Sequence, residues 1–276
     1  GLARVSEGFP ISIRLFREMH ERLLDGARGQ HRRPGELRRS PVWLGGTTLD
    51  DAVFVPPPPD EMNHALSDLE RFLHATDLPL LVQLAVAHYQ FEVIHPFLDG
   101  NGRIGRLMIP LMLVLREALP QPLLYLSAFL EQHRSEYYDH LLLTSQKGDL
   151  MPWIAFFLRG VRQQSRDSEE RTVRLVELQH QLRNELLDEG RPNSVVRLAE
   201  QLFAVPLVTA PRVEAAIGVT RPTAQAAIDA LVERGDLTEI TGRSRGRVYE
   251  ASAIYEAVYG PVSFAASTVH PELPFE

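Results

Sequence analysis

Residues 95–106 constrain this chain more than any other segment, because they join two long helix-forming segments through a loop rich in glycine and charge. They read His-Pro-Phe-Leu-Asp-Gly-Asn-Gly-Arg-Ile-Gly-Arg. The preceding segment, 80–93, is apolar nearly all round, which is typical of a buried helix. The following segment, about 103–119, predicts a second helix, with a kink or break at Pro110. A helix that starts after Gly-Asn-Gly presents unpaired backbone N–H groups at its positive end, so the sequence predicts an anion site there.

The charged side chains of this loop suit phosphate chemistry. Arg103 and Arg106 lie three residues apart on the predicted helix, so they share a face and both can bind phosphate oxygens. Asp99 is a hard oxygen ligand of the kind that Mg²⁺ takes together with substrate phosphates. His95 titrates near neutral pH and can accept a proton from a hydroxyl group. One loop therefore combines a candidate base, a candidate metal ligand and a candidate phosphate site.

At every defined position, residues 95–106 match the Fic family signature His-x-Phe-x-[Asp/Glu]-Gly-Asn-Gly-Arg-x-x-Arg, so the chain resembles that family. The resemblance extends over about residues 11–165. It implies a mainly α-helical fold in which a Fic helical domain carries a β-hairpin flap. It also implies an enzyme that moves AMP from ATP to a Ser, Thr or Tyr hydroxyl of a target protein.

In the loop, the resemblance implies that His95 deprotonates the target hydroxyl and that Asp99 binds the Mg²⁺ that bridges the phosphates. The hydroxyl oxygen then attacks the α-phosphorus, and pyrophosphate leaves. Five further positions are implied as phosphate ligands: Gly100, Asn101 and Gly102 for the α- and β-phosphates, Arg103 for the β/γ region, and Arg106 for the γ-phosphate.

Two short β-prone runs around a glycine-containing loop, 42–44 and 53–55, predict a β-hairpin. By resemblance, this hairpin is the flap that covers the active site and pairs with an extended segment of the target. The residues implied in docking the target are Val42, Trp43, Leu44, Phe54 and Val55. Tyr137 and Tyr138 fall on a helix where the family often places aromatic residues near the adenine, and core packing is an equally good interpretation of this pair.

The C-terminal part of the chain has a different pattern. Helix-forming segments at 195–203, 210–217 and 222–234 precede two β-prone runs at 237–240 and 247–249. This order of elements resembles a winged helix-turn-helix. We therefore expect a small winged-helix domain after the Fic domain.

The expected domain boundaries are 1–190 for the Fic domain with a trailing linker helix, 191–260 for the winged helix, and 261–276 for a tail. Residues 191–260 hold eight arginines and eight acidic residues, so their net charge is zero. A DNA reader usually presents a basic face. The balance favours a protein-interaction or regulatory module over a sequence-specific DNA reader, and it leaves DNA as an open partner.

The composition of the whole chain narrows the class of protein. A net charge of −7 over 276 residues argues against a general nucleic-acid-coating protein. The absence of cysteine excludes disulfides and thiolate zinc sites and agrees with a reducing compartment, so we expect a cytoplasmic protein. No apolar run reaches the ~20 residues of a membrane helix, so no membrane partner is expected. One lysine among 29 basic residues is typical of a GC-rich bacterial source, and the sequence leaves homo-oligomerisation open.

Many Fic proteins carry an inhibitory motif, [Ser/Thr]-x-x-x-Glu-[Gly/Asn], that this sequence does not match. Residues 3–8 begin with Ala, and residues 252–257 end with Ala. The chain starts without Met, and we expect that upstream residues, with an inhibitory helix among them, are missing. Residues 1–276 are therefore expected to show no autoinhibition in cis.

Two alternative functions stay open. One is a transcription regulator that acts through the winged helix and uses the Fic domain as a nucleotide sensor. The other is a Fic enzyme that transfers a different phosphate-containing group, such as UMP or phosphocholine. Phosphorylation of the target is disfavoured, because relatives with that activity tend to carry Lys where this chain has Gly102.

Overall fold

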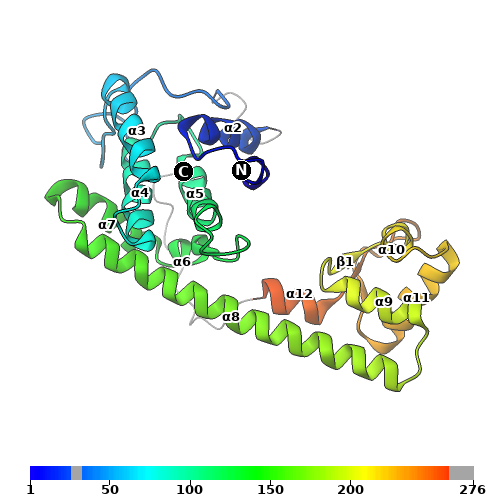
Figure 1. Cartoon of the computed structure of the whole chain (residues 1–276). Coiled ribbons are helices and arrows are strands. Elements are labelled where there is room, and N and C mark those ends of the chain that lie inside the picture. Colours follow the sequence, from blue (N-terminus) through cyan, green and yellow to red (C-terminus); the bar gives the residue numbers. More distant parts are fainter. Residues whose placement is uncertain (26–32, 261–276) are drawn as a thin grey trace. The chain divides into compact units, whose positions relative to one another are not determined.

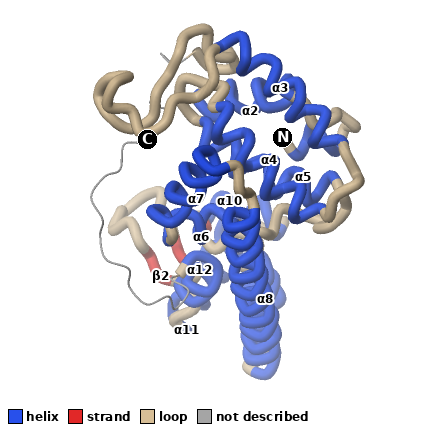
Figure 2. Tube along the Cα trace, turned by 90° about the vertical axis from the view of Figure 1, so that its left-hand side faces the viewer, coloured by secondary structure: helices blue, strands red, loops and turns tan. Residues whose placement is uncertain are grey.

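The structure is a computed structural model that describes residues 1–25 and 33–260. The chain forms two compact units, residues 1–165 and residues 166–260 (Figure 1). Both units are mainly helical, and the named strands all belong to the second unit (Figure 2). Within the described residues, no helix is both long and apolar enough to cross a membrane.

The first unit packs its helices around a central pair, α4 and α5, that carries the loop 95–100 between its members. Both helices contribute buried side chains to the core, among them Leu84 and Phe91 of α4 and Ile104 and Met108 of α5. The α-helices of this unit are α1 (Leu2–Ser6), α2 (Ile13–Leu24), α3 (Pro59–His74), α4 (Leu80–Ile94), α5 (Asn101–Leu115), α6 (Leu126–Gln132), α7 (Arg134–Lys147) and the start of α8 (Met151–Asp188).

Four predicted helices differ from the observed ones. Of the two alternatives predicted at Pro110, a kink or a break, the break does not occur, because α5 continues through this residue; the proline removes one backbone hydrogen bond, but the buried neighbours Ile109 and Leu111 hold the helix in the core. The apolar spacing of the sequence also predicts one helix at 127–144, where the structure has two helices that meet at His133. The same spacing predicts separate helices at 151–165 and 173–187, but these form one continuous helix, α8, because the polar residues between them are compatible with helix.

The predicted hairpin is reduced to a single antiparallel bridge between Leu44 and Phe54. The Leu44 N–H donates to the Phe54 carbonyl at 2.8 Å. The turn needs glycine, since Gly46 has φ 78° and an added Cβ would lie 2.4 Å from the Asp51 carbonyl oxygen. Longer strands do not form because the prolines after Val55 lack the N–H that a ladder requires.

The side chain of Arg38 fastens both arms of this hairpin to the end of α4. It is 2% exposed, and burial lowers the pKa of its guanidinium from the ordinary value without removing the charge. It donates hydrogen bonds to four backbone carbonyls, those of Ser40, Pro57, Ile94 and His95. The last two carbonyls lie at the negative end of the α4 dipole, where a cation is stabilised.

The second unit combines helices with a three-stranded antiparallel sheet of order β1-β3-β2. In that sheet Glu250 pairs with Leu207 on one side and with Thr238 on the other. The elements after α8 are α9 (Asn193–Leu202), β1 (Leu207–Val208), α10 (Ala210–Ile217), α11 (Arg221–Arg234), β2 (Thr238–Glu239), β3 (Tyr249–Glu250) and α12 (Ser252–Tyr259). The sequence patterns did not predict α1, β1 or α12, which are all short.

The end of α8 belongs to the core of the second unit. Leu182 and Leu186 are buried there together with residues of α9, α10 and α11. The compact units consequently divide between Ser165 and Arg166, whereas the expected boundary lies at 190 and 191. The expected tail, 261–276, lies outside the described residues.

We predict that Arg38→Ala lowers the free energy of unfolding by about 3 kcal/mol, because it leaves several buried carbonyls without a donor. Urea unfolding followed by circular dichroism measures this change. The matched control is Arg39→Ala, since Arg39 is 78% exposed and pairs with Glu36 at 3.5 Å; it should change stability little. Equal stability of the two variants would contradict the role given to Arg38.

Candidate active site

The loop between α4 and α5 turns through two residues in left-handed backbone conformations. His95 caps the end of α4 with φ 49° and ψ 62°, a conformation that is strained for a residue other than glycine. Gly100 precedes α5 with φ 80°. The loop is held between these points by Phe97, whose side chain is 1% exposed in the core. The backbone thus places His95 close to the first turn of α5.

His95 is in the protonation state that a general base requires. Its Nδ1 lies 3.3 Å from the Glu92 carbonyl oxygen, which can only accept, so the proton is on Nδ1 and the lone pair is on Nε2. Burial lowers the pKa of His95 to about 4, and the nearby Arg38 guanidinium acts in the same direction. The imidazole is therefore neutral near neutral pH.

The first turn of α5 has backbone N–H groups that no side chain caps. In an α-helix these N–H groups have no intrahelical partner, and the helix dipole makes this end positive. Gly102 has no side chain to cover them, and an added Cβ would approach the Arg106 Nη1 to 3.0 Å. The turn is therefore suited to an anion with several oxygens.

Asn101 has a different position from the one that the resemblance implies. It is 2% exposed, its Oδ1 accepts from the Phe97 N–H at 2.8 Å, and its Nδ2 donates to the Phe97 carbonyl at 2.8 Å. Both polar atoms of the side chain are thus engaged in closing the loop. The side chain shapes the anion site, and the backbone supplies the exposed donors.

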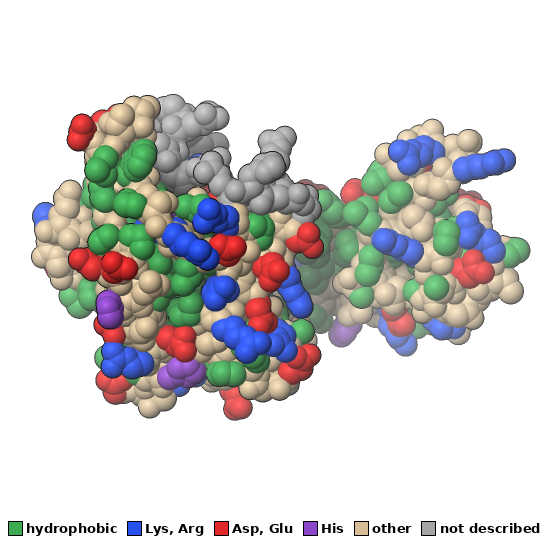
Figure 3. All heavy atoms as spheres, turned by 90° about the horizontal axis from the view of Figure 1, so that it is seen from above, with side chains coloured by type: hydrophobic (Ala, Val, Ile, Leu, Met, Phe, Trp, Pro, Cys, Tyr) green, Lys and Arg blue, Asp and Glu red, His purple; other side chains and the backbone are tan. Residues whose placement is uncertain are grey.

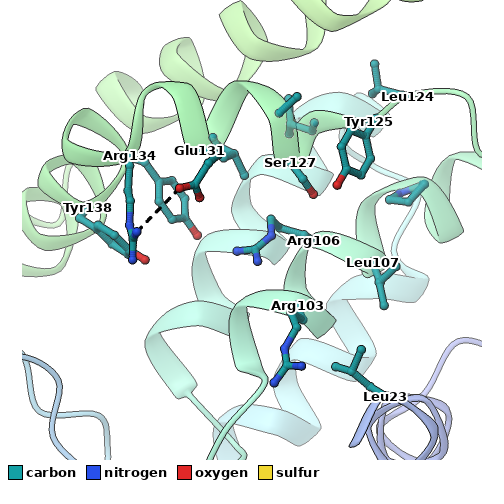
Figure 4. A pocket seen from close by; sticks show the side chains of 15 residues that line it. Leu23, Arg103, Arg106, Leu107, Leu124, Tyr125, Ser127, Glu131, Arg134 and Tyr138 are labelled. Carbon is teal, nitrogen blue, oxygen red and sulfur yellow. Dashed lines mark ion pairs between the residues drawn. The ribbon is translucent and has the colours of Figure 1, made fainter. Parts of the chain in front are cut away.

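Arg103 and Arg106 share one face of α5, as predicted from their spacing (Figure 4). The Asp99 carboxylate pairs with Arg103 at 3.2 Å, and both side chains are partly exposed. The Arg106 side chain forms no hydrogen bond or ion pair within residues 1–25 and 33–260. It is therefore available to an anionic ligand.

His20 is a site residue that sequence reasoning did not find. Its ring is fully buried and stacks on Phe97, with centroids 3.9 Å apart and an interplanar angle of 6°. Its Nε2 donates to the Asp99 carbonyl at 2.9 Å, and its Nδ1 accepts from the Gly35 N–H at 2.9 Å. Burial lowers the pKa of His20, which keeps it in the neutral form that this pair of bonds requires. In the sequence His20 belongs to no ligand-like cluster, so its pattern indicates only an ordinary surface or core histidine.

A pocket of about 510 Å³ lies beside the two arginines, between α5, α6 and α7 (Figure 4). Tyr137 and Tyr138 both contribute to its lining. Tyr137 is 4% exposed and bonds through its hydroxyl to His88 Nε2 at 3.0 Å, so it is also part of the core. Tyr138 is half-buried. The structure thus brings both tyrosines to the pocket that Arg103 and Arg106 border.

The hairpin residues divide by exposure. Trp43 and Val55 are 42% and 47% exposed, whereas Leu44 and Phe54, which form the bridge, are half-buried. Arg38 connects this hairpin to the His95 carbonyl. The hairpin therefore presents apolar side chains to solvent while its base is fixed to the loop.

Comparison with known proteins places this site in a family. Residues 10–113 match the model of the Fic/DOC family. Two relatives named "Protein adenylyltransferase Fic" are similar to this chain. That of Drosophila ananassae is 33% identical over 160 residues, which cover 56% of this chain and 28% of the relative. That of Culex quinquefasciatus is 34% identical over 152 residues, which cover 53% of this chain and 27% of the relative. The match thus spans less than a third of the length of these relatives.

A solved structure shares the fold. The crystal structure of a Fic family protein from Desulfovibrio desulfuricans G20 superposes with a TM-score of 0.51, at 23% identity, over 87% of this chain and 68% of that one. The likeness in structure agrees with the family match in sequence. Residues 10–113, which include the loop 95–106, therefore form a domain of the Fic/DOC family.

Proposed function

We propose that this chain is a protein adenylyltransferase, which transfers AMP from Mg·ATP to a hydroxyl group of a target protein. The observation that carries the proposal is the geometry around the loop. A neutral His95 whose Nε2 carries the lone pair lies next to the N-terminus of α5, which has Gly100 as its N-cap residue and bears Arg103 and Arg106. A pocket of nucleotide size adjoins the two arginines. The names of the relatives support the same activity.

In the proposed reaction, His95 Nε2 takes the proton of the target hydroxyl. The hydroxyl oxygen attacks the α-phosphorus, the bond from that phosphorus to the β-bridging oxygen breaks, and pyrophosphate leaves. The N–H groups of the first turn of α5 bind the α- and β-phosphates, while Arg103 and Arg106 neutralise the β- and γ-phosphates. The protein contributes positioning and charge stabilisation in such a phosphoryl-type transfer, without a covalent intermediate.

The residues present fit a magnesium ion shared with the nucleotide. The part of the chain that the structure describes contains no cluster of three or more candidate protein ligands. A lone carboxylate at Asp99 fits Mg²⁺, which commonly takes one or two carboxylates together with phosphate oxygens and waters. When bound, the ion would neutralise phosphate charge. Asp99 must first leave its ion pair with Arg103.

The exposed hairpin fits the docking of an extended target segment. Leu44 and Phe54 form a single bridge, so the neighbouring backbone groups can pair with another strand. The exposed side chains of Trp43, Val53 and Val55 offer apolar contacts beside that edge. We assign this hairpin as the flap that presents the target hydroxyl to His95.

Labelled nucleotides separate this proposal from its rivals. Incubation with ATP labelled at the α-phosphate should label protein and release pyrophosphate, whereas ATP labelled at the γ-phosphate should not label protein. Labelling by UTP or by a phosphocholine donor at a higher rate than by ATP would identify another Fic-type transfer. Absence of any transfer, together with tight binding to one DNA sequence, would support the regulator.

We also propose that the second unit is a winged helix, in which α10 and α11 form the helix-turn-helix and the segment between β2 and β3 is the wing. The wing carries Arg243, Arg245 and Arg247, which are exposed. Basic and acidic side chains are intermixed on the face shown in Figure 3. We therefore assign to this unit a protein-interaction or regulatory role.

We predict that His95→Ala lowers the rate of transfer by about 10²- to 10⁴-fold, because no other group of the loop can serve as the base. ATP affinity, measured by calorimetry, should stay within a few-fold of the wild type. His180→Ala is a suitable control, since His180 is exposed on α8. Transfer at the wild-type rate in the His95 variant would falsify its role.

We predict that Arg106→Ala weakens the binding of ATP by about ten- to a hundredfold, the usual worth of a charged hydrogen-bond partner. ADP binding should change little, because ADP lacks the γ-phosphate that Arg106 is proposed to bind. Both nucleotides are titrated against both proteins in the same buffer. Equal losses for ATP and ADP would assign the γ-phosphate contact to another residue.

We predict that the full chain binds DNA weakly, with no sequence preference. The net charge of residues 191–260 is zero, and near the start of α11 the basic side chain is Arg221, which pairs with Glu214 at 3.5 Å. The wing arginines permit a shallow contact that weakens as salt rises. Fluorescence anisotropy with random and genomic fragments measures this binding. A nanomolar complex with one sequence at physiological salt would contradict the prediction.

A further inference from the structure

Glu92, on the face of α4 that packs against α5, has a buried carboxyl group that the proposed reaction does not use. Its side chain is 10% exposed. Its Oε1 is fully buried and has no hydrogen-bond partner among the described residues, and the same is true of the neighbouring His88 Nδ1. Unpaired buried polar atoms are rare because they are costly, and they often mark functional positions.

The carboxyl group fits between the helices because α5 has glycine there. An added Cβ at Gly105 would lie 2.4 Å from the Glu92 Oε1 and 3.3 Å from the His88 Cε1. A larger residue at position 105 would therefore expel the carboxyl group from its place. The contact between α4 and α5 therefore depends on glycine at position 105 to accommodate the buried Glu92 carboxyl group.

The same carboxyl group lies near Arg106. A Cβ added at Gly102 would be 3.9 Å from the Glu92 Oε1 and 3.0 Å from the Arg106 Nη1, so the two side chains flank the first turn of α5. They do not form an ion pair in the described structure. Arg106 instead extends towards the pocket (Figure 4).

We propose that Glu92 is a positioning residue for Arg106, and that its negative charge competes with the nucleotide's terminal phosphate for that guanidinium. ATP binding is then coupled to the uptake of one proton from solvent by the Glu92 carboxylate. The inference rests on the proposed function, in which Arg106 binds the γ-phosphate.

The groups that face Glu92 agree with this coupling. On its own helix His88 is neutral, because burial lowers its pKa to about 4. From α7 the facing groups are the hydroxyls of Tyr137 and Tyr138, which are uncharged near neutral pH because burial raises the pKa of both. From α5 the facing charge is Arg106, which favours the carboxylate.

Burial raises the pKa of Glu92 to about 7, against the weaker opposite effect of Arg106. A phosphate that engages Arg106 brings a negative charge close to the carboxylate and raises that pKa further. ATP affinity should therefore be greatest below the pKa of the free protein and should fall as pH rises through it. The fall reaches about tenfold for each unit by which binding raises the pKa.

The experiment is calorimetric titration of ATP into the full chain from about pH 6 to about pH 8.5, in buffers of different ionisation enthalpy. The wild type should take up a proton on binding ATP and little on binding ADP. Glu92→Gln should bind ATP with an affinity that exceeds the wild-type value at the alkaline end and varies much less with pH. Glu61→Gln is the control, because Glu61 is an exposed carboxylate in the first turn of α3 and does not line the pocket. It should retain the wild-type pH profile and proton uptake.

Proton uptake is also measured in the His95→Ala background, where uptake that persists cannot come from His95. The wild-type comparison of ATP with ADP tests the coupling even if Glu92→Gln folds poorly. Wild-type protein that binds ATP without proton uptake, or with a pH profile that Glu92→Gln shares, would overturn the inference alone. Wild-type protein that binds no ATP would overturn the proposed function and the inference with it.

Discussion

The left-handed turn at the end of α4 is the constraint on which the rest of the site depends. It directs the chain away from the helix at His95 and costs roughly 1–3 kcal/mol for a residue that is not glycine. Arg38 offsets that cost, because its guanidinium donates to the carbonyls that the turn leaves unpaired. Since the same guanidinium also binds the carbonyls of Ser40 and Pro57, which flank the hairpin, one side chain holds both His95 and the hairpin in position.

Burial separates the groups of the site by charge. His95 and His20 lie where desolvation disfavours the cation, so both are neutral and each has one ring nitrogen that can accept. Arg103 and Arg106 lie on the face of α5 that borders the pocket, where their guanidinium groups can reach a ligand. A neutral imidazole beside two guanidinium groups and the positive end of a helix is an arrangement suited to binding an anion while the imidazole stays unprotonated.

The sequence predicted the site loop more completely than its supports, for a physical reason. The loop chemistry is local, so spacing alone placed Arg103 and Arg106 on one face of a helix. The hydrogen bonds of His20 to Asp99 and of Arg38 to His95 span 79 and 57 residues along the chain. The spacing of apolar residues in the sequence does not indicate partners that are so far apart. Core packing likewise decided that Tyr137 binds His88, which helix rules did not indicate. The roles implied for the loop residues stay predictions.

The two arginines of α5 differ in the carboxyl group that lies beside each of them. Arg103 pairs with the Asp99 carboxylate, which is 34% exposed, so its release leaves a hydrated anion at small cost and with room for a cation. Arg106 lies near the Glu92 carboxyl group, which is 10% exposed, and an anion left alone there is costly. On the proposed function, the Asp99 carboxylate that Arg103 releases is therefore suited to a metal ion that arrives with the phosphates. The Glu92 carboxyl group is suited to a proton instead, because it packs so closely against Gly105 that an added Cβ there would lie 2.4 Å from its Oε1.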